Sequence, residues 1–139
     1  MYYVDRKQID RRLQFIPAII TALEKIAEQW DADDTVLVLA QERAIHLAVE
    51  TVTDIGSLMI DGYLMREASS YEDIITVLRD ENIFPAAIAD QLLAAVRFRK
   101  PLVQDYDSLD SHELHRLALT LPPVLAGFAS AVKTYITEN

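Results

Sequence analysis

The sequence predicts an all-α protein, an up-and-down bundle of five to six helices. Apolar residues recur at steps of three and four along much of the chain, and no segment of useful length alternates as a half-buried strand does. Only 3 of the 139 residues are glycine, and 51% are hydrophobic, so the chain is neither disordered nor rich in loops. We expect residues 1–139 to form one domain, because a chain of this length normally does.

The first predicted helix carries one apolar stripe with steps of three and four residues between its members. Its members are Ile9, Leu13, Ile16, Ile20, Leu23, Ala27 and Trp30. Pro17 lies inside the stripe, and because proline in a helix interior costs about 3 kcal/mol, we expect a kink or a break there. An acidic connector follows, and its last residue, Asp34, is the predicted N-cap of the next helix.

The second predicted helix, from Thr35 to about Met65, is apolar almost all round. Such a helix is enclosed by its neighbours or by a second subunit. A narrow row of polar residues nevertheless follows it at helical spacing. We call this row the polar seam, and it consists of Arg43, His46, Glu50, Asp54, Ser57 and Asp61.

Three members of the polar seam, His46, Glu50 and Asp54, are spaced four residues apart and project from one face. Helical His and carboxylate pairs of this kind can bind metals in bundle cores, but such sites normally take a second pair from a facing helix. No second pair stands out, so we expect no metal. We interpret the seam as a polar row whose carboxylates pair with cations such as Arg99 or Arg43.

Two shorter helices are predicted from the signals at their ends. Ser70 with Asp73 resembles a capping box at the start of a short helix. Pro85 suits the first turn of the next helix, which continues into a group of basic residues. Pro101 then disfavours helical geometry at Lys100, so we expect the chain to bend at the basic group.

The C-terminal third also reads as helical. Asp110 with Glu113 is expected to cap a helix whose inner face carries Leu114, Leu117 and Leu121. The Pro122-Pro123 pair is expected to interrupt this helix, because neither residue can donate a backbone hydrogen bond. A last amphipathic helix then runs to the end of the chain through Leu125, Phe128, Val132 and Tyr135.

The formal net charge of -9 argues against a protein that coats nucleic acid, since phosphate binding depends on basic stripes. Three cations nevertheless fall within four residues, at Arg97, Arg99 and Lys100, where like charges repel one another. They either pair with carboxylates elsewhere in the fold or form an anion site. A second cluster contains Arg6, Lys7, Arg11 and Arg12, and the two clusters would form a positive cleft if they met in space.

Several classes of protein are disfavoured by what the sequence lacks. Cysteine is absent, which excludes disulfides and thiol nucleophiles and fits a reducing cytoplasm. No signal peptide pattern and no apolar run of about 18 residues is present, so we expect a cytoplasmic protein that does not span a membrane. There is no phosphate-binding glycine loop, nucleophile elbow or HExxH motif. We expect His112 and His115 to be solvated, and Tyr2, Tyr3 and Trp30 to pack.

The segment from Arg99 to Tyr106 reads Arg-Lys-Pro-Leu-Val-Gln-Asp-Tyr. It resembles the signature of the HepT-like toxins of the HEPN superfamily: an Arg, usually a following Asn, a His a few residues later and a Tyr two residues after it. Similar short pieces follow in the same order over nearly the whole chain, and their order and spacing carry the resemblance. They are the Tyr-x-Val-Asp-Arg opening, Gln41-Glu42-Arg43 leading to His46 and Glu50, and the connection from Met59-Ile60-Asp61-Gly62 to Ser70-Tyr71.

The resemblance implies a helical homodimer that sets its Arg and His motifs in a cleft between subunits and cleaves RNA without a metal or other cofactor. It also implies a nucleotidyltransferase antitoxin as partner, which can add AMP to the motif Tyr. By position, Arg99 would grip the scissile phosphate and Tyr106 would be the modified hydroxyl, with Arg97 and Lys100 as RNA-binding cations. We further expect the seam carboxylates to orient Arg99.

The chain departs from the family pattern at two positions. Gln104 stands at the family's His position, and Lys100 replaces the Asn. Glutamine cannot titrate, and loss of a general acid or base typically lowers a rate by about 10²- to 10⁴-fold. Three interpretations stay open: a weak nuclease, a nuclease that uses His46, His112 or His115 instead, and a non-catalytic dimeric module that binds RNA or protein. A metal- or small-molecule-binding bundle ranks last.

Overall fold

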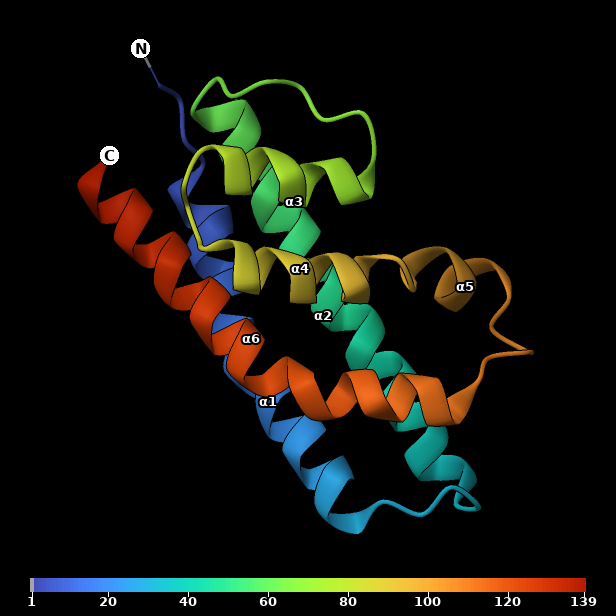
Figure 1. The fold of residues 1–139 in the computed structure, drawn as a ribbon. Coiled ribbons are helices and arrows are strands. Elements are labelled where there is room, and N and C mark those ends of the chain that lie inside the picture. Colours follow the sequence, from blue (N-terminus) through green and yellow to red (C-terminus); the bar gives the residue numbers. More distant parts are fainter. Residues whose placement is uncertain (1) are drawn as a thin grey trace.

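The computed structural model describes residues 2–139, and this range contains six α-helices and no strand, as Figure 1 shows. The all-helical prediction is confirmed. The helices are α1 (Arg6–Gln29), α2 (Thr35–Gly62), α3 (Tyr71–Asp80), α4 (Ala86–Val96), α5 (Arg99–Gln104) and α6 (Ser111–Glu138).

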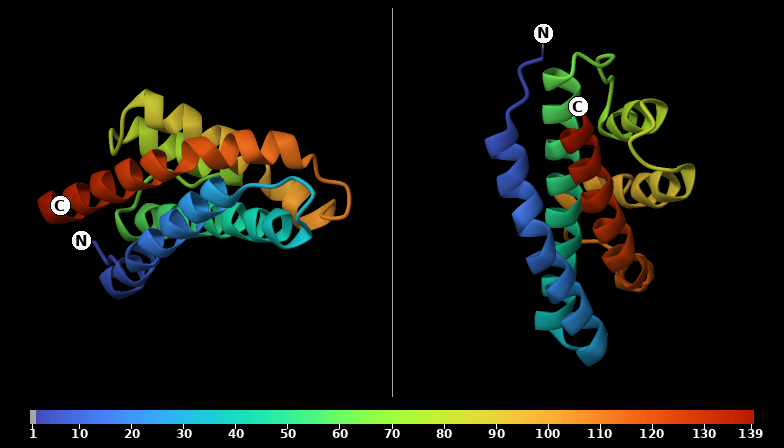
Figure 2. Two further views of the ribbon diagram at one scale, coloured as in Figure 1. Left: turned by 90° about the horizontal axis from the view of Figure 1, so that it is seen from below. Right: turned by 90° about the vertical axis from the view of Figure 1, so that its left-hand side faces the viewer.

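The three long helices α1, α2 and α6 run along the length of the molecule and pack against one another. Figure 2 shows that α3 and α4 lie on the side of α2 and α6 away from α1. The short helix α5 packs on α2. Helix α2 is therefore covered by α1, α3, α4, α5 and α6, which explains its almost uninterrupted apolar sequence.

The core draws side chains from every helix, and Ile9, Ile45, Met59 and Phe128 are completely buried within it. Full burial of a side chain of this size contributes about 1.5–3 kcal/mol to stability. The close approach of α2 and α3 depends on Gly56, because a Cβ atom at this position would clash with Cγ2 of Ile74. The absence of a side chain at Gly56 therefore lets the start of α3 approach the C-terminal part of α2 closely.

Neither helix break predicted at a proline is present. Helix α1 continues unbroken past Pro17, and α6 is one helix of 28 residues that includes Pro122 and Pro123. Each proline removes one helical hydrogen bond. In α6 the residues on both sides of the pair, Leu121 and Val124, are buried in the same core, so packing holds the helix together where local propensity would end it.

The chain bends at the basic group as predicted, but the expected non-helical geometry at Lys100 is wrong. Helix α4 ends at Val96, and α5 begins at Arg99, so Arg97 and Phe98 form the turn and Lys100 is helical. Pro101 therefore stands in the first turn of α5, where its missing N–H would have no helical acceptor in any case. This arrangement makes Arg99 the first residue of a short helix.

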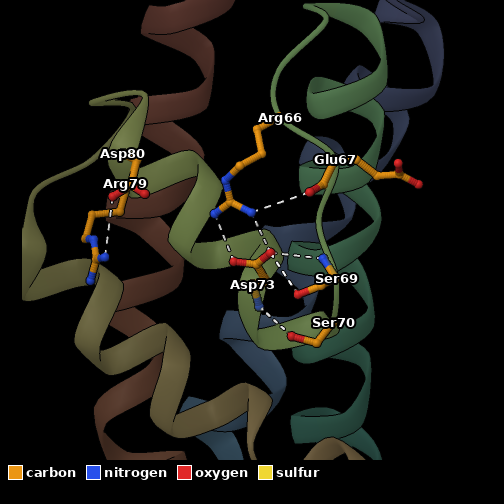
Figure 3. A network of polar contacts seen from close by, with 7 residues as sticks. All are labelled: Arg66, Glu67, Ser69, Ser70, Asp73, Arg79 and Asp80. Atoms are coloured by element: carbon orange, nitrogen blue, oxygen red, sulfur yellow. Dashed lines mark hydrogen bonds and ion pairs between the residues drawn. The ribbon is translucent and has the colours of Figure 1, made fainter.

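The predicted N-caps Asp34, Ser70 and Asp110 each accept hydrogen bonds from backbone N–H groups of the first turn that follows. The capping box at α3 is only half formed. The carboxylate of Asp73 accepts bonds from the N–H and hydroxyl of Ser69 instead of the Ser70 N–H, as Figure 3 shows. It also binds Arg66 through two hydrogen bonds, of 2.7 and 2.9 Å.

The Arg66–Asp73 contact ties the α2–α3 connection to the first turn of α3 (Figure 3). The hydrogen bond from Arg66 holds the pKa of the Asp73 carboxyl well below its usual range, and the Ser69 N–H adds to this effect. Because Tyr71 is the first residue of α3, the same contacts also fix the position of its backbone, from which the side chain extends.

Among residues 2–139, α6 is the one helix that is long and apolar enough to cross a membrane, with a mean hydropathy of 1.3 over its most apolar stretch. Its inner face, including Leu114, Leu125 and Phe128, is buried against the rest of the bundle. The core helix of a protein that crosses no membrane has these same properties.

Candidate active site

Arg99 is held by side chains from two other helices. Its Nε atom donates a hydrogen bond of 2.7 Å to Oε1 of Glu50 on α2. Its guanidinium carbon lies 3.7 Å from the centroid of the Tyr71 ring, which is the geometry of a cation–π contact. The side chain is 25% exposed, so it is neither free in solvent nor enclosed.

The outer part of the Arg99 guanidinium remains available. Only Nε takes part in a hydrogen bond, and within residues 2–139 the two terminal nitrogens have no hydrogen-bond partner. A guanidinium presents its donors as a planar fork that matches the oxygens of a phosphate. The site therefore presents a positioned cation with free donors at a partly exposed surface.

Within the polar seam, Glu50 and Asp54 pair with different arginines. His46 Nε2 lies 3.3 Å from the Glu50 Oε1 atom that also accepts the Arg99 bond. Asp54, one turn further along α2, pairs instead with Arg12 of α1 through a contact of 3.4 Å. Of the two carboxylates expected to orient Arg99, only Glu50 touches it.

The two basic clusters meet only in part. Arg12 from the N-terminal cluster and Arg99 from the second cluster bind carboxylates one helical turn apart on α2. Arg6 is directed elsewhere, because its guanidinium donates to the backbone oxygen of Ile136. The predicted positive cleft is thus reduced to two arginines, each already paired with one carboxylate.

The other candidate residues lie on the surface around Arg99. Arg97 pairs with Glu72 at 3.6 Å, and both side chains are more than half exposed, so solvent screens the pair. Lys100, Gln104 and Tyr106 are exposed, and their side chains make no hydrogen bond within the described part of the chain. Arg43 of the seam is also exposed.

A surface pocket of about 380 Å³ lies beside this site. Its lining comes from the C-terminal half of the polar seam, Ser57 and Asp61, and from the α2–α3 connection and the start of α3, including Ser69, Ser70 and Tyr71. Tyr71 therefore belongs both to the pocket wall and to the contact with Arg99. No spacing in the sequence links Tyr71 with Arg99, so this residue was missed as a candidate.

His115 is not the solvated residue that the sequence suggested. Its Nδ1 lies 2.7 Å from Oε1 of the buried Gln41, and its ring stacks on Trp30 with centroids 4.1 Å apart. Burial lowers the pKa of His115, and the neighbouring His112 lowers it further. Trp30 packs as predicted, Tyr2 packs against Tyr63, and Tyr3 is exposed.

Comparison with known proteins gives consistent results. The family model described as "Ribonuclease HepT-like" matches residues 11–132. The proposed RNase YutE of Bacillus subtilis (strain 168) is 35% identical over 136 residues, which cover 98% of this chain and 92% of that protein. The solved structure of YutE, described as a cytosolic protein of unknown function, superposes with a TM-score of 0.88 and 36% identity, covering 98% of this chain and 93% of that one.

More distant structures share the fold. A toxin–antitoxin structure with AMP-PNP has a TM-score of 0.83 at 17% identity, covering 91% of this chain and 97% of that one. A tri-AMPylated Shewanella oneidensis HEPN toxin in complex with MNT antitoxin has a TM-score of 0.82 at 18% identity, covering 91% and 96%. Together with the six-helix fold and the Arg99 motif, the family match over most of the chain shows that this protein belongs to the HepT-like ribonuclease family.

Proposed function

We propose that this protein is the toxin of a toxin–antitoxin pair and that it cleaves RNA without a metal ion. The observation that carries the proposal is the state of Arg99. Its Nε is fixed by Glu50 and its face by Tyr71, whereas its terminal nitrogens have no partner within residues 2–139. An arginine held in this way can grip a phosphodiester and stabilise the charge that develops on it during cleavage.

Arg97 and Lys100 are the proposed RNA-binding cations. Both are exposed and flank Arg99 in sequence, so they can contact phosphates on either side of the one held by Arg99. The rest of the chain carries an excess of negative charge, which confines RNA to this region by repelling it elsewhere. The proposed reaction needs no seam metal, because Glu50 and Asp54 are already paired with arginines.

We propose a homodimer whose two copies meet over the exposed face of α2. Val36 and Leu39 are 74% and 58% exposed, and they precede Arg43 and His46 at helical spacing on one face. Val103 and Tyr106, beside Gln104, are exposed as well. Apolar side chains this exposed beside a charged site favour a protein interface, which would bring the two copies of Arg99 to one cleft.

The proposed partner is a nucleotidyltransferase antitoxin that adds AMP to Tyr106. This side chain is 68% exposed and its hydroxyl makes no hydrogen bond within the described residues, so a modifying enzyme could reach it. AMP at this position would place a negative phosphate near Arg99 and compete with RNA. We propose that both proteins act in the cytoplasm, in line with the absence of cysteine.

The second candidate function is a dimeric helical module that binds RNA or protein without cleaving it. The observation in its favour is Gln104, which provides no titrating group at the family's His position. The experiment that separates the two candidates incubates the purified protein with total RNA, with and without EDTA. The expected result is degradation that persists in EDTA and is lost in Arg99→Ala. Binding of RNA without degradation would support the second candidate.

A further inference from the structure

We propose that His46 is the acid–base residue of this site, in place of the histidine that Gln104 has displaced. The inference rests on the proposed RNA cleavage and adds the group that such cleavage requires. Metal-free RNA cleavage needs a side chain that can take a proton from the 2′-hydroxyl, and histidine is the side chain best suited to this near neutral pH.

The three histidines of the chain differ in their surroundings. His115 is occupied by Gln41 and by the Trp30 ring, at the start of α6. His112 is exposed, and its side chain makes no hydrogen bond or ion pair within residues 2–139. His46 alone shares a contact with Arg99, because both side chains approach the same oxygen of Glu50, at 3.3 and 2.7 Å.

The shared oxygen fixes the spacing of the two groups. The imidazole of His46 and the guanidinium of Arg99 lie within two hydrogen-bond lengths of each other. In the proposed complex, the free nitrogens of Arg99 hold the phosphate and the ribose 2′-hydroxyl lies beside the imidazole, which the shared oxygen keeps near the guanidinium. Within the stretch from Gln41 to Glu50 that carries the family resemblance, Glu50 contacts Arg99, the first residue of α5, and Gln41 contacts His115 of α6 instead.

The orientation of the His46 ring leaves one of its nitrogens free to accept a proton. Nε2 faces Glu50, and a carboxylate favours a proton on the nitrogen that faces it. Nδ1 then carries the lone pair, and it has no partner within the described residues. The side chain is 26% exposed, which gives RNA access to it.

The reaction consumes no other reagent. Nδ1 takes the proton of the 2′-hydroxyl, the O2′–P bond forms and the P–O5′ bond breaks. The departing 5′-oxygen takes a proton from water, and the resulting hydroxide is neutralised by the imidazolium, which restores the free base. The products are a 2′,3′-cyclic phosphate and a 5′-hydroxyl. Arg99 neutralises the charge that develops on the non-bridging oxygens of the phosphate.

Among the described residues, Glu50 is the charged group in contact with His46, and Arg99 of α5 binds the same Glu50 oxygen. Glu42 and Arg43 lie one turn earlier on the helix of His46. A pH-dependent rate can therefore be assigned to His46 only if the dependence disappears with the imidazole.

The test compares His46→Gln with His112→Gln in the 139-residue chain. His46→Gln retains hydrogen-bonding capacity and removes the titrating ring, and His112→Gln makes the same change at an exposed position away from Glu50. Cleavage of an RNA oligonucleotide is followed as a function of pH, and RNA affinity and thermal unfolding are measured alongside. The expected result for His46→Gln is a loss of about 10²- to 10⁴-fold in rate.

The experiment distinguishes failure of the role proposed for His46 from failure of the proposed nuclease function. His46→Gln is expected to bind RNA and to melt like the wild type, but its cleavage rate is expected not to rise with pH as the wild-type rate does. His112→Gln is expected to keep the wild-type profile. An active wild type with an equally active His46→Gln variant overturns the role of His46 alone. A wild type that leaves RNA intact overturns the proposed nuclease function, and the role of His46 with it.

Discussion

Glu50 and Arg99 are 49 residues apart in sequence, yet they form the shortest contact of the site, 2.7 Å between Oε1 and Nε. The pair joins the middle of α2 to the first residue of α5. Because Tyr71 covers one face of the same guanidinium, the position of Arg99 depends on three helices at once.

Replacement of Arg99 by Ala should abolish RNA cleavage and growth toxicity. The substitution removes the guanidinium that Glu50 and Tyr71 hold with its terminal nitrogens free, whereas a partly exposed ion pair of this kind contributes only about 1 kcal/mol to folding. Gel-based RNA degradation and circular dichroism melting measure the two effects. An equally toxic variant would remove Arg99 from the mechanism.

The carboxylates of the polar seam provide a matched pair of substitutions. Glu50→Gln should lower the cleavage rate by about tenfold, equivalent to about 1.4 kcal/mol, because Arg99 loses its charged anchor. The loss should appear in kcat with little change in KM, and Glu50→Asp should recover part of it. Asp54→Asn, which disturbs only the Arg12 pair, should have a much smaller effect. Equal losses in both variants would contradict a specific role for Glu50.

Restoring the family's histidine should increase activity. Gln104 is exposed at the end of α5, so Gln104→His introduces a titrating ring without disturbing the core. Because His46 already acts as the base in the proposed site, the expected gain is about tenfold, below the 10²- to 10⁴-fold typical of a sole general acid or base. The same RNA degradation gel measures it. An unchanged rate would contradict a catalytic role for position 104 in this protein.

Stability should fall between neutral and mildly acidic pH because of His115. Burial lowers its pKa below the ordinary value of 6.5, so the unfolded chain binds the proton more readily than the folded one. The stability that the neutral ring contributes is complete above about pH 6.5 and is lost as the pH falls through the lowered pKa.

This pH dependence has a direct readout, because Trp30 is the only tryptophan of the chain and stacks on His115. Melting followed by Trp30 fluorescence should show a falling midpoint between pH 7.5 and 5.5 in the wild type. His115→Gln should flatten this trend. A wild-type midpoint that does not change over this interval would argue against the neutral, buried state of His115.

Asp73 should matter for stability in a different pH range. Arg66 holds its folded pKa far below the usual value near 4, so its contribution is present above about pH 4 and is lost only as the pH falls further. The difference in melting temperature between wild type and Asp73→Asn should be constant at neutral pH and should shrink in strong acid. A difference that grows on acidification would contradict the Arg66–Asp73 contact.

Local sequence signals predicted the helices well, but they predicted less well where one helix ends and the next begins. The N-caps Asp34, Ser70 and Asp110 follow from side-chain chemistry within three residues, and the structure has all three. Proline effects are local too, but in α6 burial on both sides of the Pro122-Pro123 pair outweighs them. Tertiary burial of this kind cannot be read from the pair itself.

The site was predictable where family spacing or helical periodicity applied. Periodicity placed His46 and Glu50 on one face of α2, and the family motif pointed to Arg99. The contact between them, and the Tyr71 ring on the guanidinium, depend on how α3 and α5 pack on α2. The environment of His115 depends in the same way on Trp30 and Gln41, which come from before and within α2.

The contacts that hold Arg99 would also affect the thermodynamics of the proposed RNA binding. An arginine free in solvent loses about 0.5–1.5 kcal/mol of conformational entropy when a ligand immobilises it. Glu50 and Tyr71 already restrict this side chain in the folded protein, so most of that entropy is lost during folding and little remains to be lost when RNA arrives. Preorganisation of this kind would allow an acidic protein to bind a polyanion through very few cations.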